Sequence, residues 1–194
     1  MMIKILLLLI PTIVSCFLYP KVSMLKKDCG FPNGTDTGIH IFNCNSRLDM
    51  SIKIINGKLV SKTGEIIYPI DPRISMILHL EAQNNGVQIN NNRVNVKIYE
   101  YTNYWLSNKC KWIDVPTFGL LNNIDGCKYS HNCPLKKGKI DVKIPLDLSP
   151  YSSIIDLLAS RKAYQIDVKM YNYNYNDTKH EEFACASTQL RFKI

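Results

Sequence analysis

The chain has 194 residues, of which 46% are hydrophobic and 21% charged, and its 24 basic and 16 acidic side chains give a net charge of +8. This length fits one domain, or at most two small ones. The apolar content is enough for a core and excludes global disorder, while nine glycines and no sustained heptad pattern exclude collagen-like and coiled-coil chains.

The first 16 residues have the pattern of a secretory signal peptide. Met1 to Lys4 form a short basic start, the apolar run from Ile5 extends to Val14, and the small residues Ser15 and Cys16 suit a cleavage site. A bacterial lipoprotein box with an acylated Cys16 is the alternative. Removing the leader leaves a single domain, residues 17–194, with six of the seven cysteines and a net charge of +7.

Beyond the leader the dominant hydrophobic period is two, which is typical of strands with one buried face. The predicted strands are Ile39–Phe42, Ser51–Ile55, Ser75–Glu81, Val94–Tyr99, Ile140–Ile144, Tyr164–Tyr171 and Gln189–Ile194. The pair Asn56-Gly57 predicts a turn after the second strand. One short helix is expected at Ser152–Ser160, after Pro150. Short strands with polar turns and no alternating helices predict an all-β antiparallel sandwich.

The segment from Tyr101 to Cys127 differs from the regular strands. It holds both tryptophans, Trp105 and Trp112, and is interrupted by Pro116 and Gly119. One interpretation is a crossover strand and loop packed into the core. The other is a ligand entrance or membrane contact, because aromatic side chains favour the water boundary.

No motif for nucleophilic, metal-dependent or phosphate-transfer catalysis occurs in the chain. Of the four histidines, His131 lies between Cys127 and Cys133, which suggests zinc. A second close Cys or His pair is missing, and thiols in an oxidising compartment should be bridged. We therefore predict no metal, no cofactor and no catalytic residue, with a hydrolase whose site is assembled in space as a remote alternative.

Two sequons and the scattered basic residues bear on location and partners. Asn33-Gly34-Thr35 and Asn176-Asp177-Thr178 predict glycosylation at Asn33 and Asn176 on a eukaryotic secretory route. Basic residues that are scattered on a secreted chain fit an anionic membrane surface or an acidic ligand better than nucleic acid. The alternative is that the lysines simply keep the protein surface soluble.

Six cysteines allow 15 disulfide pairings, and spacing alone does not choose among them. Cys127 and Cys133 are close enough in sequence to close a small loop. Cys29 and Cys185 would tie the two ends of a sandwich together, which leaves Cys44 with Cys110.

The segment Asp125–Gly138 resembles the signature of the ML (lipid-recognition) superfamily, in which a short disulfide loop ends in Cys-Pro, an apolar residue and a basic residue before a strand. Three further features agree in order: Asp28-Cys29-Gly30 after the leader, the strand at Tyr164–Tyr171, and Ala184-Cys185-Ala186 opening the last strand. The family includes the Niemann-Pick type C sterol carrier, the ganglioside activator and the group 2 mite allergens.

The resemblance implies an immunoglobulin-like sandwich whose two sheets hold an apolar cavity, with bridges Cys29–Cys185 and Cys127–Cys133. A Cys44–Cys110 bridge is our own inference, because the sterol carriers have a close pair of cysteines where this chain has only Cys44. The aromatic segment before Cys127 and the insert at 150–160 look more like the ganglioside-activator branch, so no sterol-contacting residue is carried over.

Under this resemblance the inward phases of the strands predict the lipid-binding residues. The predicted lining is Val96, Ile98, Ile144, Tyr164, Ile166, Val168 and Met170, and the predicted entrance is Trp105, Trp112, Phe118 and Leu121. The alternative for each of them is ordinary close-packed core. Lys128, Lys136, Lys137 and Lys139 would draw the entrance to anionic headgroups, or simply form a solvated face.

The predicted function is a secreted, non-enzymatic lipid-binding or lipid-transfer protein for a sterol, fatty acid, phospholipid or glycolipid. Its expected partners are a lipid ligand, an anionic membrane surface touched transiently, and a protein acceptor or hydrolase, with no nucleic acid. The expected location is extracellular or the lumen of the endomembrane or lysosomal system. The alternative is a secreted immunoglobulin-like interaction module with a packed core that binds a receptor or host factor.

Overall fold

The computed structural model describes residues 28–44, 49–104, 109–147 and 161–193. Its elements are η1 (Pro32–Gly34), β1 (His40–Asn43), β2 (Ile52–Val60), β3 (Met76–Asn84), β4 (Asn92–Tyr104), β5 (Lys109–Val115), β6 (Ile124–Asp125), α1 (Gly126–Ser130), β7 (Gly138–Leu146), β8 (Ala163–Asn172) and β9 (Glu182–Arg191). None of the helices in these ranges is long and apolar enough to cross a membrane.

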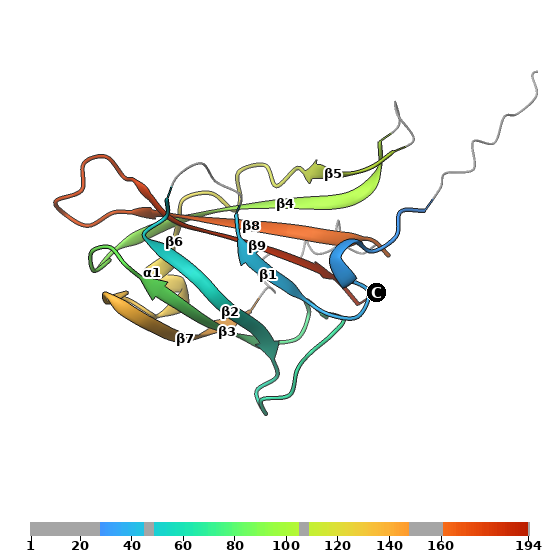
Figure 1. The fold of residues 1–194 in the computed structure, drawn as a ribbon, viewed down its shortest axis with the longest axis horizontal. Helices are drawn as coiled ribbons and strands as arrows, with labels where there is room; N and C mark the ends of the chain where they lie inside the picture. Colours follow the sequence, from blue (N-terminus) through green and yellow to red (C-terminus); the bar gives the residue numbers. More distant parts are fainter. Residues whose placement is uncertain (1–27, 45–48, 105–108, 148–160, 194) are drawn as a thin grey trace, which may run out of the picture.

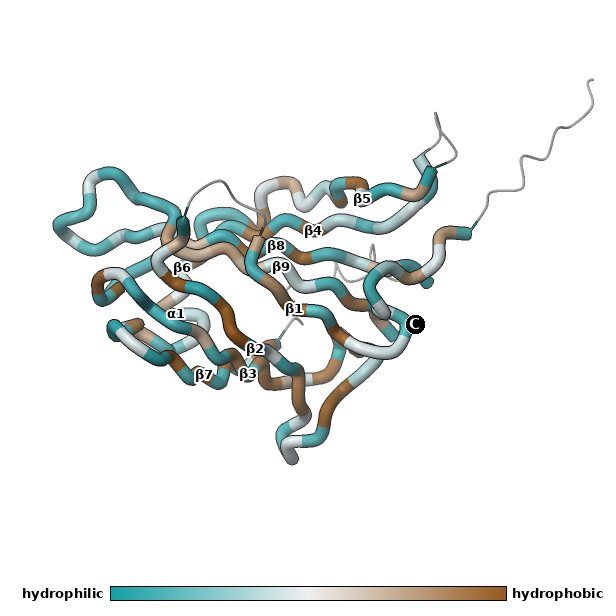
Figure 2. The backbone as a smooth tube through the Cα atoms, viewed as in Figure 1, coloured by the Kyte–Doolittle hydropathy of each residue, from teal (hydrophilic) through white to brown (hydrophobic). Residues whose placement is uncertain are grey.

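The strands form two antiparallel sheets that face each other as two layers (Figure 1). The larger sheet has the order β1-β9-β8-β4-β5, with β6 also paired to β4, and the smaller sheet has the order β2-β3-β7. The prediction of an all-β sandwich is confirmed. Strands lie at every position where the period of two predicted one, and Figure 2 shows polar and apolar residues alternating along them.

The predicted turn at Asn56-Gly57 is wrong, because β2 continues through these residues to Val60. The register between β2 and β3 shifts between Ile54 and Asn56, so the pair sits at a β-bulge rather than in a hairpin loop. A Cβ atom on Gly57 would lie 2.6 Å from Cδ1 of Ile41 and 2.8 Å from Cδ2 of Leu80. Glycine lets these two side-chain tips approach the strand, and a larger residue would force them to shift. The sequence pattern does not distinguish this use of glycine from a turn.

The segment Tyr101–Cys127 is divided among several elements. β4 extends to Tyr104, β5 pairs with it, and a loop leads to β6 and the one-turn helix α1, which was not predicted. The last strand ends at Arg191, earlier than predicted, and Phe192 forms an isolated parallel bridge with Ile70. The leader at 1–16 and the expected helix at 152–160 lie outside the described residues, so these and the domain limits of 17–194 stay predictions.

Two of the three expected disulfide pairings are wrong. The structure joins Cys29 to Cys110 and Cys44 to Cys185, and only Cys127–Cys133 is as expected. The reason is the pairing of β1 with β9, which places the residue after β1 beside the middle of β9. The backbone N–H of Cys44 donates to the carbonyl oxygen of Cys185 at 3.0 Å, so the backbones of these two cysteines are paired as well.

Candidate ligand-binding interior

Two separate clusters of buried side chains lie between the sheets. The first comprises Leu59, Ile70, Met76, Ile98, Val115, Leu121, Tyr164, Leu190 and Phe192. The second comprises Ile52, Ala82, Ile89, Leu135, Ile140, Phe183 and Ala184. Each cluster draws from both sheets. The two clusters lie toward opposite ends of the strands, since β3 contributes Met76 to the first and Ala82 to the second.

Strand β8 runs along the interior from one cluster to the other. Tyr164 is fully buried in the first cluster, Ile166 packs against it, and Met170 packs against the second cluster. Because side chains alternate along a strand, Val168 shares their inward phase. It belongs to neither cluster and is only partly buried, although β8 is a central strand of its sheet. Val168 therefore marks a middle layer that the two clusters do not fill.

Other inward residues of the two sheets also lie outside both clusters. Ala186, its partner on β9, is buried but belongs to neither cluster, and the same holds for Leu80 on β3 and Ile144 on β7. Thr188, the partner of Ile166, is only partly buried. A close-packed sandwich would bury such inward positions on central strands most completely.

The outward face of β9 is covered more completely than its middle inward positions. Ser187 and Gln189 are 3% and 4% exposed. Ser187 donates to Asp167 at 2.7 Å, and Gln189 accepts from the Asn33 side chain at 2.6 Å. Hydrogen bonding explains why these polar groups tolerate burial. The partial exposure of Thr188 is thus a property of the interior and not of a poorly covered strand.

The sheets are joined most closely along one edge of the sandwich. The main contacts between strands of different sheets are those of β2 with β1 and β9. There the Asn43 side chain donates to the carbonyl oxygen of Ile54 at 2.9 Å and accepts from its N–H at 2.8 Å. One carboxamide thereby satisfies both backbone groups of a residue at the edge of the smaller sheet and closes the sandwich on that side.

Six of the seven predicted lining residues occupy inward positions between the sheets. The seventh, Val96, packs against the first cluster. Two of the predicted entrance residues do not line the interior. Trp112 pairs with Tyr101 across β4 and β5, with ring centroids 5.0 Å apart, on the phase opposite to buried Val115. Phe118 is 85% exposed. Leu121 is buried in the first cluster, and Trp105 lies outside the described residues.

Several interior residues were missed by sequence reasoning. Leu80, Ala186 and Thr188 stand at the middle of the interior, together with Ile41, whose Cδ1 approaches Gly57. Leu80 lies in the predicted strand Ser75–Glu81, but the pattern of a single strand does not show which residues of the other sheet it faces. The alternation of apolar residues along β3 was the sequence signal that could have identified Leu80.

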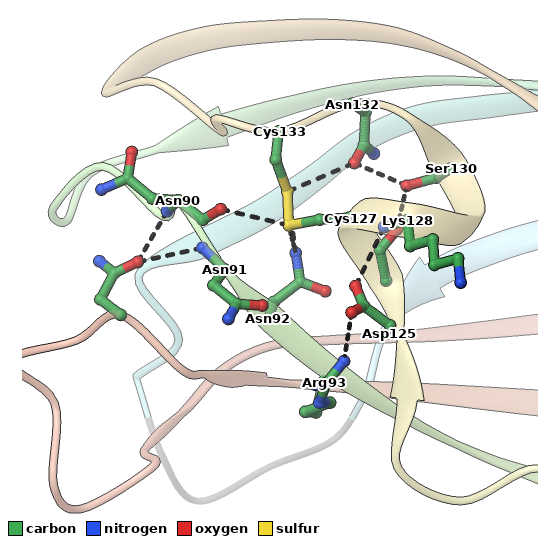
Figure 3. The surroundings of a disulfide bond; sticks show 12 residues. Asn90, Asn91, Asn92, Arg93, Asp125, Cys127, Lys128, Ser130, Asn132 and Cys133 are labelled. Atoms are coloured by element: carbon green, nitrogen blue, oxygen red, sulfur yellow. Dashed lines mark hydrogen bonds and ion pairs between the residues drawn. A yellow bond between two sulfur atoms is a disulfide. The ribbon is translucent and has the colours of Figure 1, made fainter.

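The disulfide loop that carries the family resemblance is built around a buried asparagine (Figure 3). The Asn92 side chain donates to Sγ of Cys127 at 3.3 Å and to Sγ of Cys133 at 3.4 Å. Asp125 precedes α1, and its carboxylate accepts from the N–H of Lys128 at 3.0 Å as an N-cap. These contacts explain how the disulfide loop is held in its conformation.

Asp125 also forms an ion pair with Arg93, at 2.6 Å. The hydrogen bond from the Lys128 backbone, followed by the Arg93 contact, lowers the pKa of Asp125 below its usual value. A depressed carboxyl pKa contributes stability above the unfolded-state pKa, and that stability is lost as the pH falls through the folded-state pKa.

We expect Asp125→Asn, which keeps a capping side chain but removes the charge, to be less stable than the wild type at neutral pH. The difference should shrink as the pH falls below about 4, the ordinary aspartate pKa. Urea unfolding at a series of pH values measures it, with exposed Asp114→Asn as a control for general loss of negative charge. A stability difference that does not change with pH would contradict this account.

Among the described residues, the remaining charged groups do not form a recognisable active centre. His79 lies 2.6 Å from Asp141 on the outer face of the smaller sheet, and His180 stacks on Tyr173 at 3.9 Å in the β8–β9 loop. Within the described ranges, no group of three or more His, Cys, Asp or Glu side chains is arranged to hold a metal ion. Lys128, Lys136, Lys137 and Lys139 are exposed and form no ion pair with a described residue.

No protein-family model and no curated protein sequence matches the chain. Among solved structures, the chain is similar to a Niemann-Pick type C2 protein from the Japanese carpenter ant, with a TM-score of 0.44 and 15% sequence identity. The match covers 79% of this chain and 99% of that one. A likeness at this level carries no information on ligand or activity, so the function has to be argued from the interior itself.

Proposed function

We propose that the protein is a secreted, non-enzymatic lipid-binding protein of the ML type that holds an apolar ligand between its two sheets. The observation that carries the proposal is the partial exposure of inward-facing Val168 on a central strand, between two separate buried clusters. Natural interiors are normally close-packed, so an inward middle layer that stays accessible favours a space for a ligand.

The physical chemistry of such a site is simple. An apolar chain or ring system in water costs about 25 cal/mol for each Å² of its surface, and an interior lined by Val168, Ile166 and Ile144 removes that cost. No proton transfer or bond cleavage is involved, so binding needs no titratable group. The ligand class is a sterol, fatty acid, phospholipid or glycolipid, and delivery would be to a membrane, a protein acceptor or a hydrolase.

A secreted or lumenal location belongs to the same proposal. Three disulfide bonds fit an oxidising compartment, because such bonds are rare where the thiol pool is reduced. The predicted leader at 1–16 would direct the chain there.

The two sequons differ in their surroundings, and we expect their glycan occupancy to differ too. Asn176 is exposed in the β8–β9 loop, which projects from the sheets in Figure 1. Asn33 is exposed as well, but its side chain donates to Gln189, and Thr35 of its sequon is fully buried. Asn176→Gln should reduce the mass of the secreted protein by one glycan, while Asn33→Gln should leave the glycan mass unchanged. Intact-mass measurement before and after endoglycosidase treatment checks this, and a glycan lost only from Asn33→Gln would contradict it.

Lipid transfer provides the functional test. Protein made through a secretory route is mixed with donor vesicles that contain a self-quenched fluorescent lipid and with unlabelled acceptor vesicles. Lipid binding predicts faster dequenching in proportion to protein concentration, with heat-denatured protein as the control. If no fluorescent fatty acid, sterol, phospholipid or glycolipid is bound or moved, the interior site is refuted and a packed interaction module is favoured.

A further inference from the structure

The loop between β5 and β6 exposes two large apolar side chains. Phe118 is 85% exposed and Leu120 is 57% exposed, and they are separated only by Gly119. The sequence from Val115 to Asn123 contains no charged residue. Single exposed apolar residues are common on soluble proteins, but a neighbouring pair in an uncharged loop is a candidate contact surface. We call residues 117–120 the apolar tip.

The tip is held in place by its own backbone. Phe118 and Gly119 both have positive φ angles, 51° and 77°, which make the chain reverse sharply. The N–H of Leu120 donates to the carbonyl oxygen of Thr117 at 3.0 Å, and that of Asn122 to Gly119 at 3.1 Å. A loop so tightly turned keeps its two apolar side chains displayed and does not fold them under.

The base of the tip is anchored to the larger sheet. Leu121 is buried in the first interior cluster, and its carbonyl oxygen accepts from the N–H of Val96 at 2.9 Å. The N–H of Asn123 donates to the Asn95 side chain at 2.7 Å. The tip is therefore continuous, through Leu121, with the first buried cluster, which flanks the middle layer that we propose as the ligand site.

A second copy of the chain is a poor occupant for this surface. Two side chains offer roughly 300 Å² of apolar area, whereas a stable protein interface buries about 800 Å² on each partner. A lipid surface needs no such area, because a few apolar side chains can enter its interfacial region individually. The net charge of +7 that remains without the predicted leader, and the exposed Lys97, next in sequence to the Val96 that anchors the loop, complement an anionic surface.

We propose that the apolar tip docks the protein on an anionic lipid bilayer, with Phe118 and Leu120 entering the headgroup–acyl boundary. The inference deepens the proposed function and rests on it, since docking brings the ligand interior to the membrane from which lipid is taken. Transfer from vesicles then depends on the tip, whereas binding of lipid already in solution does not.

The test compares Phe118→Ser/Leu120→Ser with Tyr175→Ser, which removes a fully exposed aromatic side chain from the β8–β9 loop, outside the apolar tip. Sedimentation with phosphatidylcholine vesicles, with and without phosphatidylserine, measures docking. Loading with a fluorescent fatty acid in vesicle-free solution measures the interior. We expect the tip variant to lose vesicle binding about tenfold or more while it loads normally, and the control to match the wild type in both assays.

Different outcomes refute different claims. Unchanged vesicle binding by the tip variant, or no vesicle binding by the wild type, would overturn the docking proposal while leaving the interior site standing. Dimerisation of the wild type that the tip variant loses would also overturn it, in favour of a second copy. Vesicle binding that depends on the tip in a wild type that loads no lipid would support docking and refute the interior site.

Discussion

Val168→Phe is expected to abolish lipid loading while the protein remains folded. The substitution adds a ring at the inward position between the two clusters, where we propose that the ligand lies. In a close-packed core such an insertion costs about 1–3 kcal/mol, because neighbouring side chains are forced from their rotamers. In an open interior the ring occupies the ligand's place, so the loss appears in loading and not in the free energy of unfolding.

Val115→Phe is the matched control, since it makes the same chemical change inside the first buried cluster. We expect it to lower the free energy of unfolding by about 1–3 kcal/mol and to affect loading less than Val168→Phe does. Urea unfolding and fluorescent fatty acid titration measure the two quantities on both variants. Equal destabilisation by the two substitutions would mean that the middle of the interior is packed like the cluster.

Loss of the Cys44–Cys185 bridge is expected to have the largest effect on stability. The two cysteines are 141 residues apart, and in the chain-entropy model closing such a loop stabilises the protein by about 5 kcal/mol. Cys44→Ser/Cys185→Ser should lose most of this, a large part of the total stability of a typical domain. The bridge also fixes β1 to β9, beside the hydrogen bond between their backbones.

The matched control is Cys127→Ser/Cys133→Ser, whose bridge closes a six-residue separation and should contribute only about 2 kcal/mol by the same model. Urea unfolding compares the two double variants. Peptide mapping of the unreduced wild type tests the pairing without requiring either variant to fold. Recovery of Cys29 joined to Cys185 would contradict the structure and restore the pairing that the family resemblance implies.

The strands were predictable from sequence because each buries one face, so their apolar residues repeat every second position. The same local pattern does not indicate which strands pair with each other. Pairing of Cys44 with Cys185 follows from the register of β1 against β9, in which Asn43 faces Ala186, and that register joins segments more than 140 residues apart. Gly57 illustrates a different limit, because a bulge with close packing and a tight turn both call for glycine.

The candidate site was predictable where it follows a regular strand. Ile166, Val168 and Met170 lie on the expected inward phase of β8. The aromatic segment was harder, because Pro116 and Gly119 interrupt its period. The orientation of Trp112 is set by its pairing with Tyr101 across the β4–β5 hairpin. No strand pattern applies to Phe118, whose exposure depends on the turn that holds it.

Native mass spectrometry of the secreted protein, released gently from its expression medium, tests the central claim most directly. The account predicts a wild-type species heavier than the polypeptide and its glycans by the mass of one lipid, which organic extraction releases for identification, and Val168→Phe without that added mass. A wild type that carries no lipid, and gains none after incubation with fatty acid, sterol, phospholipid and glycolipid, would contradict it.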